Sequence, residues 1–342
     1  MKRISGIFLF AFCFPALSVA QSNEEKTKKN FQEDKSGLTT TLFAEGGAIN
    51  VSFSEDGDTS SSSNSKSKID YKGGSAIDFG LEVAFKGVGG SLKFASSGQK
   101  ITTSAGRKPL SDYMKSSGTF LNLNYRMGQY FFYGMYGTQK GFYVDRIGEV
   151  EATSLTSAER FHDSLSLKQI VGSVYYFFND KFDIDTIVKS GVRQETSEGS
   201  FFVYGSYDDI DFSAEREFLP IAFRERWESI NTVRGVTVQS LTANGGYIYT
   251  FRSGPFSLTG GGGAGYGAGK VSVATTNNAF SRGEGAQEPI IHVNVVFGSE
   301  YRLDNSFFGT RLIAEGPSIA LNKMVSVSFP LMSIKLFYGM DF

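Results

Sequence analysis

The sequence predicts an all-β protein, a transmembrane antiparallel β-barrel of about 12 strands, and three observations support this prediction. Apolar and polar residues alternate with a period of two in many segments, as they do in half-buried strands. The chain of 342 residues holds 40 Gly, 32 Phe and 16 Tyr, a composition that suits pleated strands better than helices. Short turns and long polar loops separate the segments in alternation, which is typical of membrane barrels.

The first 20 residues predict a secretory signal peptide. Lys2 and Arg3 precede an apolar stretch, and the small residues Ser18 and Ala20 follow it. We therefore expect export, with cleavage near Ala20. The only cysteine, Cys13, lies in this segment, so the exported chain would have no thiol for disulfide, zinc-thiolate or cysteine-nucleophile chemistry.

The remaining chain divides into a charged segment and an expected barrel. Residues 21–36 are nearly devoid of apolar side chains, so we expect disorder there. The barrel is expected over residues 37–342, and because no stretch of it resembles a helical span, strands are its only route through a membrane. The 34 Lys and Arg residues nearly balance the 35 Asp and Glu residues, which leaves no basic field to attract nucleic acid.

The alternation can be followed segment by segment. In each segment one set of side chains two apart is apolar and the other set is polar or small. The apolar sets run from Ile77 to Phe85, from Leu121 to Tyr125, from Ile291 to Phe297, from Phe308 to Ala314 and from Met332 to Phe342. We expect these sets to face lipid and the polar sets to face the lumen of the barrel.

The connections give the strand count. Short turns are expected at "KGVGG", "MGQ", "NDK", "RSGP" and "LDNS", and long loops at stretches such as "DGDTSSSSNSKSK" and "ATTNNAFSRGEGAQE". This predicts about twelve strands, with both ends of the chain on the short-turn side. The stretch 181–212 is too long for one strand; if its "RQETSEG" is a loop and "FLPIAFRERW" a further strand, the count becomes fourteen. A soluble secreted β-sandwich that binds a ligand stays open as an alternative, because it shows the same period.

The last strand carries a possible assembly signal. Tyr338, Met340 and Phe342 share one apolar face at the end of the chain. This pattern resembles the signal that the outer-membrane insertion machinery recognises, and the resemblance implies that machinery and outer-membrane lipid as partners. We expect the protein in the outer membrane of a Gram-negative bacterium.

Four blocks of the chain carry a further resemblance. They are "YKGGSAIDFGLEVAFKGVGGSLKFA", "FFYGMYGTQKGFYV", "YYFFNDKFDID" and "GGYIYTF". They resemble an uncharacterised domain-of-unknown-function family of Gram-negative bacterial proteins that are taken for outer-membrane β-barrels. At 196–200, "TSEGS" matches the family's lysine-serine-alanine-glycine-serine run only in part. The resemblance implies the architecture and no activity.

The polar faces of the expected strands carry charges of both signs. The polar residues expected to face the lumen are Asp78, Glu82, Lys86, Lys93, Arg126, Lys168, Asp183, Asp185, Lys189, His292, Glu300, Arg302, Arg311, Glu315 and Lys335. They form either a structural network, in which buried charges must be paired, or the lining of a pore. A ring of one sign, which would indicate an ion-selective channel, is absent from this set.

We expect a non-enzymatic barrel, either a narrow passive pore or a structural component of the envelope. The enzymatic alternative is a lipid-modifying hydrolase, because "RFHDSLS" places His162 and Ser164 two residues apart, as base and nucleophile. The two histidines of the chain do not have zinc-site spacing, and "TGGGGAGYGAGK" lacks the glycine and hydroxyl positions of a phosphate-binding loop. We expect no metal and no cofactor.

Overall fold

The computed structural model describes residues 38–55, 67–73, 78–85, 87–99, 114–147, 150–151, 161–185, 190, 194–221, 224, 231–276, 287–321, 325–328 and 331–342. All of them belong to one compact unit, Leu38–Phe342. The predicted signal peptide, residues 1–20, and the charged segment 21–36 lie outside the described residues. Within the described ranges, no helix is long and apolar enough to cross a membrane.

The described unit consists of strands. They are β1 (Thr39–Glu55), β2 (Ser67–Gly73), β3 (Asp78–Phe85), β4 (Val88–Gln99), β5 (Met114–Met127), β6 (Tyr130–Ile147), β7 (Val150–Glu151), β8 (Phe161–Phe177), β9 (Glu198–Ser213), β10 (Val233–Ser253), β11 (Phe256–Thr275), β12 (Gln287–Leu303), β13 (Ser306–Leu321), β14 (Val325–Ser328) and β15 (Leu331–Asp341).

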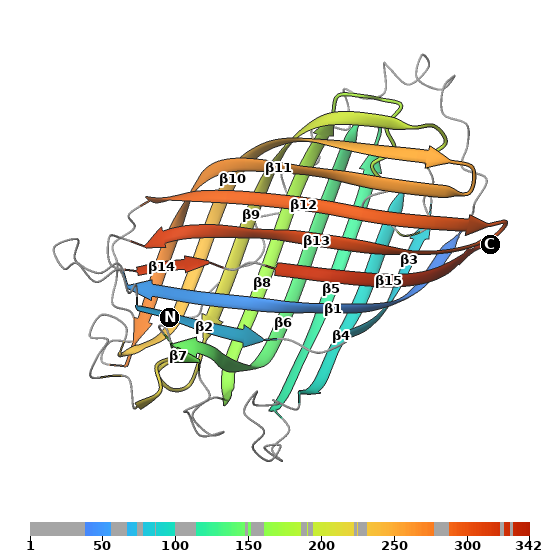
Figure 1. Ribbon diagram of the computed structural model, residues 1–342. Coiled ribbons are helices and arrows are strands. Elements are labelled where there is room, and N and C mark those ends of the chain that lie inside the picture. The colour runs from blue at the N-terminus through green and yellow to red at the C-terminus, as the bar shows by residue number, and fades with distance from the viewer. Residues whose placement is uncertain are drawn as a thin grey trace, which may run out of the picture. The chain divides into compact units, whose positions relative to one another are not determined.

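These strands form one closed antiparallel barrel of 12 strands (Figure 1). β2 and β3 pair with successive parts of β1 and act as one barrel strand, as do β14 and β15, while β7 pairs only with β6. The cylinder closes where β1 pairs with β15, from Thr39 opposite Asp341 to Ile49 opposite Leu331. The predicted class and count are therefore confirmed. The sandwich alternative is wrong, because a single sheet closes on itself.

The two ends of the barrel differ in their connections. At one end, the turn end, tight turns contain Gly87, Gly128, Gly254 and Asp304, all with the positive φ that such turns demand. The first and last residues of the unit, Leu38 and Phe342, also lie at this end. The backbone N–H of Phe342 donates a hydrogen bond to the carbonyl of Leu38 at 2.9 Å. The strand ends that the long connections join lie at the opposite end, the loop end.

One connection at the turn end contradicts the sequence prediction. We expected a short turn at "NDK", but the chain between β8 and β9 is an inner segment, residues 178–197, whose described part packs inside the barrel. Phe182 and Ile184 of this inner segment are buried against Phe131 and Phe177. The fourteen-strand alternative is wrong for the same reason: "RQETSEG" belongs to the end of the inner segment and the start of β9, and the described residues of "FLPIAFRERW" lie outside the strands.

The outer surface of the barrel is apolar over a central band. On β10 the large side chains between Leu241 and Phe251 that point outward are exposed, whereas Thr242, Ile248 and Thr250 between them are buried. At about 3.4 Å per residue and a tilt of about 40°, this stretch spans about 26 Å. That height matches the hydrocarbon-facing band of outer-membrane barrels.

The polarity of the wall reverses towards the loop end. On β9, Phe201 and Val203 face outward and are exposed, but further along the same strand Ile210 and Phe212 face inward and are completely buried. Asp211 between them points outward. The loop end therefore has an apolar inside and a polar outside, which is the arrangement of a water-soluble barrel.

A row of outward polar residues marks the level of this reversal. We call it the polar collar, and its members are Lys168 on β8, Asp209 and Asp211 on β9, Gln239 on β10 and Lys270 on β11. Its members face one another across neighbouring strands, since Lys168 is opposite Asp211 and Gln239 is opposite both Asp209 and Lys270. The Gln239 side chain donates a hydrogen bond to Asp209 at 3.3 Å.

Apolar side chains fill the barrel beyond the collar. This loop-end core comprises Ile49, Val51, Phe53, Ile69, Tyr71, Phe120, Phe142, Val144, Leu165, Leu167, Ile210, Phe212, Phe218, Leu219, Val233, Val236, Val238, Val271 and Ile290. Phe218 and Leu219 come from the connection between β9 and β10, and the hydroxyl of Tyr71 donates a hydrogen bond to the carbonyl of Phe218. The connection thereby closes the loop end from within.

Inward glycines leave room for neighbouring rings and backbone. A Cβ on Gly246 would lie 2.3 Å from the carbonyl oxygen of Gly262 and 2.5 Å from the ring of Phe202. Replacing Gly246 by Ala should therefore lower the free energy of unfolding by about 1–3 kcal/mol, because the backbone of the next strand cannot yield. Gly172→Ala is the matched control, since no atom lies within 4 Å of its added Cβ. Urea unfolding in micelles, followed by circular dichroism, measures both; equal midpoints for the two variants would contradict the prediction.

Candidate functional site

A buried ion pair joins the barrel wall to the inner segment. Lys335 on β15 lies 2.6 Å from the carboxylate of Glu82 on β3, and both residues are buried. The same carboxylate accepts a hydrogen bond of 2.6 Å from the backbone N–H of Ser190. A buried charge is tolerated only when it is paired and hydrogen-bonded, and Glu82 meets both conditions. It also ties the inner segment to the wall.

A second ion cluster lies on the neighbouring strands. The ammonium group of Lys93 on β4 is 3.1 Å from Glu45 on β1 and 3.6 Å from Asp78 on β3. It also lies 4.5 Å from the ring centroid of Phe120, where a cation is attracted to the ring face. The ammonium group of Lys93 is therefore in contact with two carboxylates and one aromatic ring.

Further ion pairs lie towards the turn end. Arg302 on β12 pairs with Glu300 at 3.5 Å and with Asp341 on β15. Arg126 on β5 pairs with Asp183 of the inner segment. The interior charges that we describe are therefore interleaved and paired across strands, which is the structural network that the sequence offered as one alternative.

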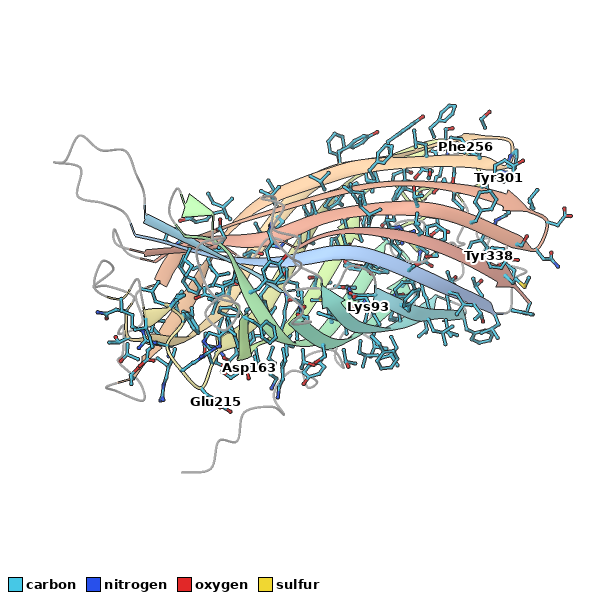
Figure 2. The ribbon with its side chains drawn as sticks, turned by 60° about the horizontal axis from the view of Figure 1, so that its bottom comes forward. Lys93, Asp163, Glu215, Phe256, Tyr301 and Tyr338 are labelled. Carbon is cyan, nitrogen blue, oxygen red and sulfur yellow. The ribbon has the colours of Figure 1, made fainter. Side chains whose placement is uncertain are left out.

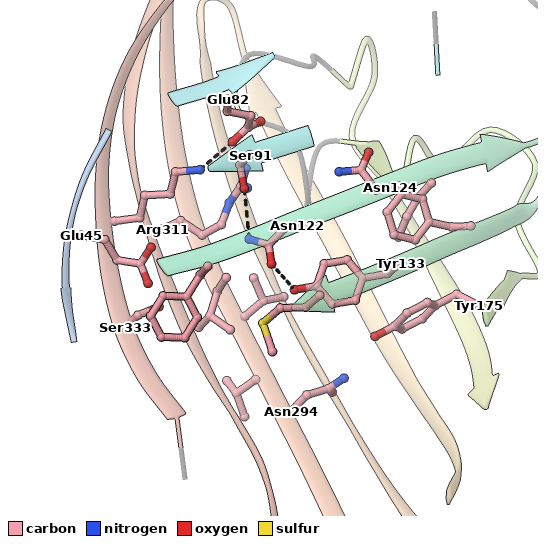
Figure 3. A pocket seen from close by; sticks show the side chains of 18 of the residues that line it. Glu45, Glu82, Ser91, Asn122, Asn124, Tyr133, Tyr175, Asn294, Arg311 and Ser333 are labelled. Carbon is pink, nitrogen blue, oxygen red and sulfur yellow. Dashed lines mark hydrogen bonds and ion pairs between the residues drawn. The ribbon is translucent and has the colours of Figure 1, made fainter. Parts of the chain in front are cut away.

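A cavity of about 220 Å³ lies between the inner segment and the loop-end core. One wall of it is charged and polar, with Glu45, Glu82 and Arg311, while the opposite wall is aromatic, with Tyr175 and Phe202. Figure 3 shows Asn122 between Ser91 and Tyr133 on the polar side, joined to each by a hydrogen bond. The cavity is thus amphipathic.

A hydrogen-bonded group adjoins this cavity through Asn294, which lines it. The hydroxyl of Tyr204 contacts the Nδ1 atom of His292 at 3.0 Å and accepts a hydrogen bond from Asn294 at 2.9 Å. Buried Asp208 accepts a hydrogen bond from Ser240 at 3.2 Å. Within the described part of the chain, no three His, Cys, Asp or Glu side chains are grouped so that they could hold a metal ion.

The sequence pair His162 and Ser164 lies at the loop end, beyond the polar collar. The Ser164 hydroxyl is 3.3 Å from Nδ1 of His162, and Nε2 of His162 is 3.2 Å from the carbonyl oxygen of Glu217. If Nε2 carries the proton and donates it to that carbonyl, Nδ1 is free to accept from Ser164. The pair therefore has the geometry of a serine–histidine dyad, with a backbone carbonyl in place of the carboxylate that orients the imidazole in hydrolases.

Acidification should weaken the loop end through His162. Burial lowers the pKa of His162 below its usual 6.5, and the charges of Arg216 and Arg224 lower it further. The hydrogen bond to the Glu217 carbonyl and the Asp163 carboxylate raise the pKa but do not reverse the net shift. The unfolded chain therefore takes up the proton first, and stability that is complete above pH 6.5 falls as the pH drops below it. Urea unfolding of the wild type and of His162→Asn, between pH 8 and 5, measures the effect; an equal pH dependence in both proteins would contradict it.

Comparison with protein families decides the relationship that the motifs suggested. The family described as Domain of unknown function (DUF4421) matches residues 18–342, nearly the whole chain. The chain belongs to the DUF4421 family. No curated protein sequence matches it.

Solved structures similar to this DUF4421 protein include three outer-membrane proteins. The translocator domain of the autotransporter NalP from Neisseria meningitidis is 12% identical, with 96% of this chain and 97% of that chain covered and a TM-score of 0.40. The COG4313 outer membrane channel from Pseudomonas putida F1 is 10% identical, with 92% and 98% covered and a TM-score of 0.38. The outer membrane protease OmpT from Escherichia coli is 7% identical, with 90% and 98% covered and a TM-score of 0.38.

The structure places most of the expected lumen residues of this DUF4421 protein inside the barrel. Asp78, Glu82, His292, Arg311 and Lys335 are buried there, and Lys93, Arg126, Glu300 and Arg302 are partly buried in ion pairs. Asp183 and Asp185 are also inside, but on the inner segment and not on a strand of the wall. Lys86 and Lys189 lie outside the described residues, as does the side chain of Glu315. Tyr338, Met340 and Phe342 point outward and are exposed.

The prediction for Lys168 is wrong. The sequence prediction placed it in the lumen, but its side chain is exposed on the outside of β8, 6.0 Å from the ring centroid of Tyr136. Leu165 and Leu167 occupy the inward positions there and belong to the loop-end core. The prediction rests on the rule that the apolar face of a strand meets lipid, and beyond the polar collar that rule fails.

Sequence reasoning missed several residues of the cavity wall. Glu45 lies two positions after Phe43, and both face the interior, a signal that period two offers but that was not followed through "TTTLFAEGG". Period two places Asn122, Asn124 and Asn294 on the polar faces of β5 and β12, but the predicted set of lumen residues contains only charged residues and His292. Their convergence on one cavity depends on strand register, which one sequence does not supply.

Proposed function

We propose that this protein is a closed, non-enzymatic outer-membrane β-barrel that serves as a structural component of the envelope. The observation that carries the proposal is the filling of the barrel at both ends, by the loop-end core and by the inner segment, within a wall whose outer band is apolar. A passive pore needs a continuous polar path, and the loop-end core interrupts it.

The membrane location rests on the outer surface. Aromatic residues such as Phe256, Tyr301 and Tyr338 gather around the turn end, while Asp163 and Glu215 lie at the opposite end (Figure 2). Aromatic girdles at the edge of an apolar band are typical of outer-membrane barrels. By this argument the turn end faces the periplasm and the polar loop end faces the exterior.

The end of β15 carries the surface that we assign to membrane insertion. Tyr338 and Met340 of β15, with Phe342 directly after it, form an exposed apolar row. β15 is the strand that closes the sheet against β1. We take this row to be the surface that the insertion machinery contacts before closure. Outer-membrane lipid covers it afterwards.

Two measurements on the purified full-length chain test the proposal. An unboiled sample should migrate differently from a boiled one on a denaturing gel, because a closed barrel resists unfolding by detergent. In planar bilayers the wild type should show no steady conductance. Replacing Phe182 and Ile184 by Ser should loosen the inner segment and lower the temperature of the gel mobility shift, whereas Asp180→Ser, an exposed change in the same segment, should not. Neither variant should conduct, because the loop-end core still fills the other end of the barrel.

Either of two results would overturn the proposal. Steady ohmic conductance through the wild type would show an open pore. A processed chain that is monomeric and freely dissolved without detergent would remove the membrane location.

A lipid hydrolase is the second candidate function, favoured by the contact of 3.3 Å between Ser164 and His162. In such an enzyme the Ser164 oxygen would attack an acyl ester while Nδ1 of His162 takes its proton; the alcohol would then leave, and water would release the acyl group. The site lies beyond the polar collar, at the level where outer-leaflet lipid meets water.

Lipid extracts from cells with and without the protein test this candidate. The hydrolase predicts released acyl groups with the wild type and none with Ser164→Ala. Ser166→Ala is the matched control, because Ser166 donates its hydroxyl to the carbonyl of Ser213 and not to a histidine. Identical lipid profiles in the presence of the wild type and of Ser164→Ala would contradict the hydrolase candidate.

A further inference from the structure

The central cavity has the size of a site for one small ring. Its volume of about 220 Å³ exceeds the roughly 150 Å³ of an engineered apolar cavity that binds benzene. Phe120 of the loop-end core and Ile184 of the inner segment are both part of its lining. A single six-membered ring with one or two small substituents fits this space.

The aromatic wall favours a flat apolar body. Tyr175, Phe177 and Phe202 line the cavity and form a contiguous group, with ring centroids 5.5 Å apart for Phe177 and Phe202 and 6.2 Å apart for Tyr175 and Phe202. Phe131 joins this group 6.0 Å from Tyr175. Another aromatic ring would extend the group with the offset and edge contacts that such rings prefer.

The polar wall favours a molecule without net charge. The lining lysines already have anionic partners, since Lys335 pairs with Glu82 and Lys93 pairs with Glu45. Arg311, also in the wall, is buried in the field of Glu82 and Glu300. A bound carboxylate or ammonium group would have to break one of these pairs to gain a partner of its own, and an isolated charge there is costly.

One buried group in the wall indicates the polar atom that the ligand must supply. Asn124 lines the cavity and its side chain is 8% exposed. Its Oδ1 atom has no hydrogen-bond partner among the described residues, unlike the neighbouring Asn122, which bonds to both Ser91 and Tyr133. A buried acceptor without a donor is destabilising, so a donor that enters the cavity is favoured there.

We propose that the cavity is a binding site for a small uncharged aromatic molecule with a hydroxyl group, of the phenol class. Its ring packs against Tyr175, Phe177 and Phe202, and its O–H donates to Oδ1 of Asn124. The inference goes beyond the closed-barrel proposal, because a barrel can be closed to ions with or without a ligand inside it.

The turn end provides the access route. A smaller polar cavity of about 20 Å³, room for a single water, shares Val296 and Arg311 with the central cavity and reaches Gln194 of the inner segment. A ligand that enters from this side passes Gln194 of the inner segment.

Equilibrium dialysis of the full chain in micelles, against the same micelles without protein, tests the proposal with three probes. Phenol should bind saturably with one site per chain. Toluene, which has the ring without the donor, should bind at least about 10-fold more weakly, because the acceptor stays unpaired. Benzoate, which carries a charge, should show no saturable binding.

Two variants locate the site. Ser333→Leu should abolish phenol binding by filling the cavity, since Ser333 lies in its lining, and Ile334→Val on the outer face of the same strand is the matched control. Asn124→Leu should abolish the preference for phenol over toluene. The boiled and unboiled gel comparison checks that each variant has closed.

Three results would overturn the inference. They are no saturable phenol binding to the wild type, equal binding of phenol and toluene, or unchanged phenol binding by closed Ser333→Leu. Because the probe comparison on the wild type needs no variant, a failure of Ser333→Leu to fold leaves the test decisive. Conductance in planar bilayers bears only on the closed-barrel proposal, so the two can fail separately.

Discussion

Replacing Lys335 by Met should lower the free energy of unfolding by about 3–5 kcal/mol, because it leaves the Glu82 carboxylate buried without its cation. The two groups are 2.6 Å apart, and both residues are buried. Urea unfolding in micelles, followed by circular dichroism, gives the change. The same variant should also loosen the inner segment, since Glu82 accepts the backbone hydrogen bond from Ser190.

Two controls separate this effect from the loss of a lysine in general. Lys168→Met removes an exposed lysine of the polar collar and should change stability by no more than about 0.5 kcal/mol. The double variant Glu82→Gln with Lys335→Met removes both charges and should be more stable than Lys335→Met alone. If Lys335→Met proved no less stable than Lys168→Met, the ion pair would contribute nothing to the free energy of unfolding.

Replacing Phe212 by Ala should cost about 3–5 kcal/mol, the range for truncating a buried ring in a packed core. Phe212 has no exposed surface and lies at the centre of the loop-end core, with ring centroids 5.1 Å from those of Phe142 and Phe218. The cavity left behind would be lined by rings on several strands and cannot collapse around one residue. The expected readout is a lower urea midpoint and a lower temperature for the gel mobility shift.

Phe201→Ala on the same strand is the matched control for this prediction. Its ring points outward and is 67% exposed, so in the folded barrel it contacts detergent or lipid and not a core. Its removal should cost much less than that of Phe212. Equal losses for the two variants would contradict the reversal of polarity along β9.

Much of the wall could be predicted from the sequence because period two is dictated by backbone geometry. The alternation in "SIKLFYGMDF" gives the outward Leu336 and Tyr338 and the inward Lys335 and Phe337 that the structure has. The strand count followed from the connections. The aromatic positions of the outer band followed because hydrocarbon accepts only apolar side chains.

The reversal of polarity was missed because period two fixes which residues share a face and not what that face meets. In "FFVYGSYDDIDF" the odd, outward positions change from Phe201 and Val203 to Asp209 and Asp211, while the even, inward positions are apolar at both ends, at Phe202 and at Phe212. That change of the outward positions from apolar to acidic is visible in the sequence. It indicates the level at which a strand leaves the apolar band.

The inner segment and the cavity could not be predicted in the same way. "KFDIDTIV" alternates like a wall strand, but Phe182 and Ile184 are used inside the barrel against rings from β6, β8 and β9. Contacts of this kind depend on residues far apart in the chain. For the same reason, period two could assign Glu82 and Lys335 to the interior but could not predict that they form a pair.

The polar collar makes insertion of the barrel into a membrane energetically costly. In the proposed orientation, Lys168, Asp209, Asp211 and Lys270 end on the far side of the bilayer and must pass through hydrocarbon to arrive there. Cationic side chains on a barrel surface cost about 2–4 kcal/mol each at the bilayer midplane, with Asp and Glu somewhat less, so several crossing together amount to a substantial kinetic barrier. We therefore expect spontaneous insertion into plain vesicles to be slow, and assisted insertion to proceed through a site where the lipid is thinned.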